Sequence, residues 1–116
     1  MEDMGDELAA GNTLVVAERS GIIRAVYGDA KRVLGWTAEA LVGKPLVTLI
    51  PEDMRAAHLN GLAQFNATGE GPILNRTVEV QCVGRDGMAR DIALTVYDGD
   101  VDPVIYGWIE SRAGGA

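Results

Sequence analysis

The chain is short of several residue types, and each shortage narrows what the protein can be. It has one cysteine, Cys82, so no disulfide can form within the chain, which fits a reducing compartment. No apolar run approaches the roughly 18–20 residues of a membrane-spanning helix. The net charge of −7 argues against binding to nucleic acid or to an anionic membrane. The acidic start, MEDMGDELAA, does not resemble a signal peptide. We therefore expect a soluble, cytoplasmic protein.

Hydrophobic residues are abundant, in contrast to these shortages. They make up 47% of the 116 residues, which is enough for one compact domain with a real core and too much for a disordered chain. The last residues, RAGGA, are typical of a tail or linker. We expect an N-terminal cap segment over residues 1–12, one folded domain over 13–112 and a short tail over 113–116.

The first half of the chain predicts a hairpin followed by helices. Two β-rich runs, residues 14–17 and 22–26, flank the turn residues Ser20 and Gly21. Asp29 and Thr37 are candidate caps of two short helices, and Pro51 suits the first turn of a longer one. The three predicted helices cover residues 29–34, 37–41 and 51–68.

The second half predicts strands. Residues 74–82 and 92–97 alternate with a period of two and flank a tight turn at GRDG, and a last strand is expected over 104–109. Strands before and after a group of short helices are explained by an α+β fold, in which an antiparallel sheet carries the helices on one face.

Four stretches, in this order, carry a family likeness: GIIRAVYGDAKRVLGWTAEALVGKPLVTLIPEDMRAAH, ATGEGP, VEVQCVGRDG and VIYGWIESR. They resemble the PAS domain family of signalling modules from about Thr13 to Arg112. The resemblance implies a five-stranded antiparallel sheet in the order 2-1-5-4-3, with helices that enclose a pocket against it. Family members sense small ligands, light, redox state or oxygen, and many form dimers. The D-I-T ending that is common in the family is replaced here by Glu110, Ser111 and Arg112.

The only histidine, His58, falls on the predicted long helix in one stripe with Met54, Leu62 and Phe65. A neutral imidazole that faces a core can ligate iron or simply pack. The position of His58 resembles that of the proximal histidine in oxygen-sensing haem PAS domains, and the spacing to Phe65 is preserved. This resemblance makes haem b the leading cofactor candidate. The other possibilities are no cofactor or a small apolar ligand.

The chain departs from the haem-binding sensors at the position of their distal arginine, which lies across the pocket from the proximal histidine. The distal arginine of the haem sensors falls at Val78 in this chain. Arg76 lies two residues earlier and therefore on the same face of the strand. Arg76 could meet a bound gas or a haem propionate, or it could lie at the end of the strand and reach water.

We expect the pocket to lie between the long helix and the sheet. Its predicted binding residues are His58, Leu62, Phe65, Ile73, Arg76, Val78, Leu94, Val96 and Ile109.

Three functions stay open. The first is a sensory module that binds a small apolar ligand or cofactor and signals through dimer contacts to an effector, such as a histidine kinase or a transcription regulator. The second is a haem-based gas or redox sensor with His58 as proximal ligand, and the third is a ligand-free dimerisation module. No Ser, Cys or His is grouped with an acid in a catalytic pattern, so we do not expect an enzyme.

Overall fold

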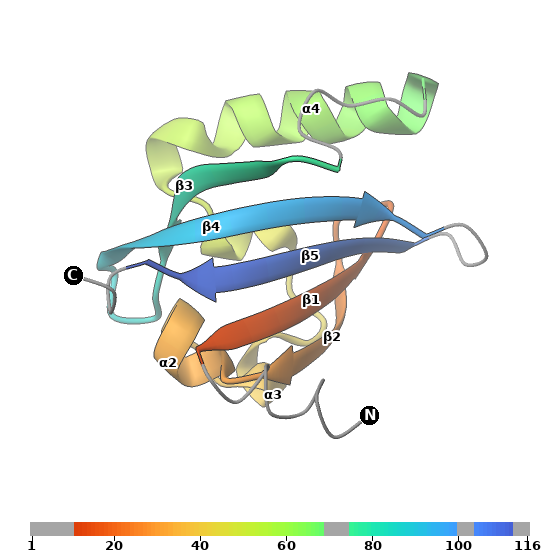
Figure 1. Ribbon diagram of the computed structural model, residues 1–116. Helices are drawn as coiled ribbons and strands as arrows, with labels where there is room; N and C mark the ends of the chain where they lie inside the picture. The colour runs from red at the N-terminus through yellow and green to blue at the C-terminus, as the bar shows by residue number, and fades with distance from the viewer. Residues whose placement is uncertain (1–10, 69–74, 100–103, 113–116) are drawn as a thin grey trace.

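A computed structural model describes residues 11–68, 75–99 and 104–112. These residues form a five-stranded antiparallel sheet in the order β2-β1-β5-β4-β3 together with short helices (Figure 1). The predicted α+β class and strand order are therefore confirmed. The strands are β1 (Asn12–Glu18), β2 (Ile23–Gly28), β3 (Thr77–Val83), β4 (Ala89–Asp98) and β5 (Val104–Ser111). The helical elements are α2 (Ala30–Leu34), α3 (Ala38–Leu41), η1 (Leu46–Leu49), η2 (Glu52–Met54) and α4 (Arg55–Thr68).

Strand β5 is central, although it comes last in the chain. It pairs with β1 on one side and with β4 on the other, so residues from both halves of the sequence meet across it. Gly107, for example, lies between Val15 and Val96. Since directly opposed residues share one face of a sheet, this register lines up Val15, Gly107 and Val96 on the same side.

The short helices begin and end partly as predicted. Gly35 closes α2 with φ 80°, a left-handed conformation that favours glycine. The Thr37 hydroxyl accepts a hydrogen bond from the Ala40 N–H at 3.2 Å and so caps α3. The prediction that Asp29 caps α2 is wrong, because its side chain makes no cap hydrogen bond. Its ψ of 61° is not the extended backbone that a capping residue needs.

The long helix begins later than predicted. Residues Glu52–Met54 form the 3-10 turn η2, and regular α-helix starts at Arg55. A 3-10 turn has about three residues per turn, so Met54 leaves the stripe that α-helical spacing predicts. The Met54 side chain is 53% exposed, whereas Phe65 is buried.

The dense part of the core lies under β1, β2 and the first helices. Ile23, Val33, Leu34 and Leu41 are almost completely buried there. The Ile23 N–H donates to the Lys44 carbonyl at 2.8 Å, and the Ile23 carbonyl accepts from the Gly43 N–H at 2.8 Å. These bonds hold the segment after α3 against strand β2.

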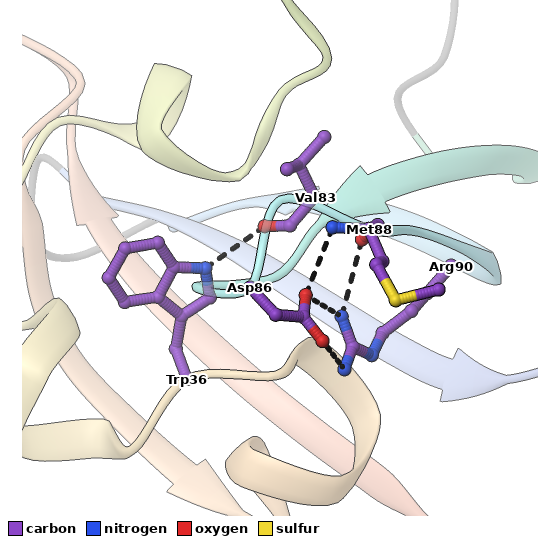
Figure 2. A network of polar contacts seen from close by, with 5 residues as sticks. All are labelled: Trp36, Val83, Asp86, Met88 and Arg90. Carbon is purple, nitrogen blue, oxygen red and sulfur yellow. Dashed lines mark hydrogen bonds and ion pairs between the residues drawn. The ribbon is translucent and has the colours of Figure 1, made fainter.

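A polar network ties the β3–β4 turn to the loop after α2 (Figure 2). The Trp36 Nε1–H donates to the Val83 carbonyl at 2.9 Å. The Asp86 carboxylate accepts from the Met88 N–H at 3.0 Å and from the Arg90 guanidinium at 3.3 Å. The network anchors the end of β3, which supplies one wall of the site described next.

Candidate functional site

A cavity of about 360 Å³ lies between α4 and the sheet face that meets the helices. Its volume is within the range of about 300–1,000 Å³ that is typical of small-molecule sites. Most of the lining is aliphatic. The sheet contributes Val15, Ala17, Val80, Ile92, Leu94, Val96, Ile105 and Ile109, and the helical side contributes Leu34, Leu46, Leu49, Ile50, Ala57 and Leu62.

Most of the predicted binding residues meet at this cavity. Those in its wall are His58, Leu62, Phe65, Leu94, Val96 and Ile109. Val78 is half-buried and pairs with Leu94, which places it on the same sheet face, but it does not line the cavity. Arg76 is exposed just before β3, and Ile73 lies outside the described residues.

The sequence interpretation missed the contribution of β1 and, apart from Ile109, that of β5. Val15, Ala17 and Ile105 line the cavity because the sheet order places their strands at its centre. Gly107 also borders it from β5. The alternation of Val15 and Ala17 in the first hairpin was the available signal, but it does not say which helix the strand will face.

His58 is the polar feature of this apolar wall. Its side chain is half-buried, and the Nε2 atom is buried without a hydrogen-bond partner in the described part of the chain. Desolvation lowers the pKa of His58 below its ordinary value. The imidazole is therefore neutral near pH 7, with one N–H and one free lone pair. Buried polar atoms without partners are rare and cost about 1–3 kcal/mol.

Helix α4 borders the cavity without packing tightly on the sheet. Of its fourteen residues only Phe65 is buried. Gly61, one turn after His58, lines the cavity, and a Cβ added there would meet no atom within 4 Å. At Gly61 the helix therefore faces open space rather than side chains.

The C-terminal end of α4 is held by the β1–β2 turn. The Arg19 guanidinium carbon lies 4.8 Å from the centre of the Phe65 ring, and its Nη2 is 2.6 Å from Asp98 Oδ1. The Asn66 side-chain amide donates to the Arg19 carbonyl at 2.7 Å. Arg19 thus joins the helix, the turn and the end of β4.

Cys82 also lines the cavity, from strand β3. Its thiol is buried, and desolvation raises its pKa to about 11, an effect that the nearby charge of Arg90 partly offsets. A thiol with a raised pKa is a poor nucleophile at neutral pH, so Cys82 acts as a small apolar residue.

The opposite face of the sheet is aromatic. Tyr97, Tyr106, Trp108 and Leu14 line a shallow hollow there. Tyr27 pairs with Leu14 and so shares this face. Four of the six aromatic residues of the chain therefore lie on the face that does not carry the cavity.

Two further kinds of site are not found in the described part of the chain. No group of three or more His, Cys, Asp or Glu residues there could hold a metal ion. None of the helices described is long and apolar enough to cross a membrane.

Comparison with solved structures identifies the architecture. A PAS domain from Desulfitobacterium hafniense superposes with a TM-score of 0.71 at 14% identity, over 91% of this chain and 97% of that one. The PAS domain of the Cronobacter turicensis quorum-sensing receptor RpfR, in complex with BDSF, gives a TM-score of 0.64 at 16% identity, over 88% and 94% of the two chains. The chain has the fold of a PAS domain.

Other comparisons add context to the PAS fold. A domain of a sensor histidine kinase/response regulator from Geobacter sulfurreducens gives a TM-score of 0.71 at 16% identity, over 95% of this chain and 93% of that one. An uncharacterized protein from Azorhizobium caulinodans is 34% identical over 86 residues, which are 73% of this chain and 12% of that protein. This chain thus matches only a small part of that relative's length. No protein-family model matches the chain.

Burial of the Cys82 thiol should make the folded protein less stable as the pH rises into the alkaline range. The pKa of Cys82 is raised from 9.0 to about 11, so the unfolded chain loses this proton first as the pH rises. The contribution is complete below about pH 9 and is lost between about pH 9 and 11, by roughly 2–3 kcal/mol. Urea unfolding across this range should show a steeper fall for the wild type than for Cys82→Ala. Parallel pH profiles for the two proteins would contradict the assignment.

Proposed function

We propose that this chain is the sensory domain of a longer signalling protein, binds a small, mostly apolar molecule in the cavity and transmits the bound state through dimer contacts to an effector. The observation that carries the proposal is the cavity of about 360 Å³ with an almost wholly apolar wall. An apolar cavity of this size loses dispersion contacts when empty, and a matching ligand restores them.

Two of the structural neighbours support ligand binding and an attached effector. The RpfR PAS domain is known in complexes with BDSF and with C12:0. The Geobacter neighbour is a domain of a sensor histidine kinase/response regulator. In this proposal the sensory domain spans residues 13–112, with residues 1–12 as a cap and 113–116 as a tail. The protein is cytoplasmic, and its effector is a kinase or a transcription regulator.

The signal would start at α4. The middle of this helix faces the cavity, and its C-terminal end is held through Phe65 and Arg19. A ligand that contacts both α4 and the sheet would favour one arrangement of the two and shift the population toward it. Strands β4 and β5 connect the two faces, because Leu94 and Val96 point to the cavity while Tyr97 lies on the aromatic face.

Binding of a purely apolar probe tests the first part of the proposal. Isothermal calorimetry with p-xylene should show one site, and the ligand should raise the melting temperature. Leu94→Trp fills the cavity and should lower the affinity for p-xylene by about tenfold or more. A tenfold change corresponds to about 1.4 kcal/mol of binding free energy. Leu59→Trp is the control for the introduced tryptophan, since Leu59 is 54% exposed on α4 and does not line the cavity.

The absence of any bound small molecule would contradict the proposal that the cavity is a binding site. If p-xylene neither binds nor changes the melting temperature, and no small molecule is extracted from the purified protein, the cavity is not a binding site. The chain would then be a ligand-free interaction module.

The aromatic face is the proposed dimer contact. Tyr97 is 45% exposed there, beside Tyr106 and Trp108. Aromatic residues are enriched at protein–protein interfaces because they bury large area at low entropic cost. A homodimer through this face would place the interface directly behind the cavity.

Tyr97→Arg should convert a dimer to a monomer, because it introduces two facing like charges into an apolar contact. Met88→Arg is the control, since Met88 is 65% exposed in the β3–β4 turn and away from the hollow. Analytical ultracentrifugation measures both. A wild type that is monomeric at high concentration, or a Tyr97→Arg variant that stays dimeric, argues against this face.

Haem-based sensing is the second candidate, and His58 favours it. A buried, unpartnered and neutral imidazole is in the state in which histidine ligates haem iron. His58 would hold the iron, the aliphatic wall would surround the macrocycle, and the exposed Arg76 would be available to a propionate. Haem would supply the gas-binding metal.

An absorption spectrum tests haem binding. On this second candidate, the purified protein takes up haemin and shows a Soret band that shifts with carbon monoxide after dithionite. His58→Ala should remove the band while the circular dichroism of the fold is kept. A His58→Ala variant that retains stoichiometric haem excludes His58 as the ligand, and a wild type that takes up none excludes the haem sensor.

A further inference from the structure

The cavity wall contains no charged side chain among the described residues. Apart from two glycines, its members are aliphatic or aromatic except for His58, Cys82 and Gln81. The Gln81 amide already donates to Asp91 at 3.0 Å, and a thiol is only a weak hydrogen-bond donor. An ionised ligand would lose hydration here and meet no opposite charge among the described lining residues, which is strongly unfavourable. The ligand that fits is therefore neutral.

One strong hydrogen-bonding position remains in this wall. The Nε2 atom of His58 has no partner in the described ranges and is closed to water-sized groups in this arrangement, so a ligand oxygen in the cavity reaches it when the imidazole turns toward the cavity. Depending on the tautomer, this nitrogen either donates or accepts, so a hydroxyl or a carbonyl group would satisfy it. Because partners for buried polar atoms are nearly universal in proteins, a single ligand atom that supplies one accounts for the position of this imidazole.

The space beside His58 sets the size of the ligand. Glycine inside a helix costs about 1 kcal/mol relative to alanine, yet a Cβ at Gly61 would touch nothing within 4 Å. On the facing strand, a Cβ at Gly107 would meet only ordinary contacts, 3.5 Å from Leu94 Cδ1. The cavity of about 360 Å³ therefore has room for a small molecule beside His58.

We propose that the ligand is a neutral, largely apolar small molecule with one hydroxyl or carbonyl group that hydrogen-bonds to His58 Nε2. This inference rests on the proposed function and adds the chemical class of the ligand. His58 then determines specificity: the site prefers the singly polar molecule to its hydrocarbon analogue and excludes ionised carboxylates.

Three probes that share the p-xylene skeleton test this assignment by calorimetry. They are 4-methylbenzyl alcohol, 4-ethyltoluene and 4-methylbenzoate. In His58→Leu, the affinity for the alcohol should fall roughly ten- to hundredfold, whereas that for 4-ethyltoluene should stay equal or rise. His58→Gln keeps a hydrogen-bonding group and should recover part of the loss. Leu59→Ala is the control on the exposed side of α4 and should change neither affinity.

A second readout reports the hydrogen bond itself. In ¹⁵N-labelled wild-type protein, the alcohol should shift the Nε2 resonance of His58, and 4-ethyltoluene should shift it much less. This measurement does not depend on the stability of any variant, so it decides the question even if His58→Leu does not fold.

The outcomes separate the two levels of the proposal. If p-xylene and 4-ethyltoluene bind but the alcohol gains nothing from His58, the hydrogen bond is wrong and the apolar site stands. Tight binding of ionised 4-methylbenzoate would overturn the neutral class. If none of the probes binds, the proposed function itself fails.

Discussion

The way in which α4 is held over the sheet determines the rest of this structure. The helix is attached through Phe65, whose ring packs under the Arg19 guanidinium, and Arg19 is in turn paired with Asp98. Its middle contributes no buried residue, so the sheet and the helix do not close on each other. A close-packed interior would leave no void larger than a water molecule. The loose middle of α4 is therefore the structural cause of the cavity.

The two faces of the sheet carry different side chains. Strand residues alternate between them, so β4 presents Leu94 and Val96 to the cavity and Thr95 and Tyr97 to the other side. Aliphatic side chains line the inner face and can adapt to a ligand, whereas aromatic side chains gather on the outer face. In the proposed function, a shift of the inner residues has only one layer of backbone to cross before it reaches the dimer contact.

His58 connects two of the competing functions, because haem ligation and a hydrogen bond to a ligand oxygen use the same atom. A neutral imidazole with an unpartnered Nε2 can ligate iron, bond to a ligand oxygen or remain unsatisfied at a cost. These outcomes differ in spectrum and in ligand preference but need no difference in the fold. The distinction between a haem sensor and a sensor of a ligand with one polar group therefore lies in the chemistry at one side chain.

The sequence by itself determined the elements and, through family likeness, their arrangement. Period-two alternation identified the strands, and glycine after Leu34 and threonine before Ala38 marked helix ends, because these signals are local. It also identified His58, Leu62, Phe65, Leu94 and Val96 as neighbours. Only the tertiary structure decided that Met54 is exposed, that β1 and further residues of β5 besides Ile109 line the cavity, and that His58 Nε2 has no described partner. Those facts depend on the 3-10 turn η2, on pairing between distant strands and on how far α4 stands from the sheet, none of which is encoded in a local pattern.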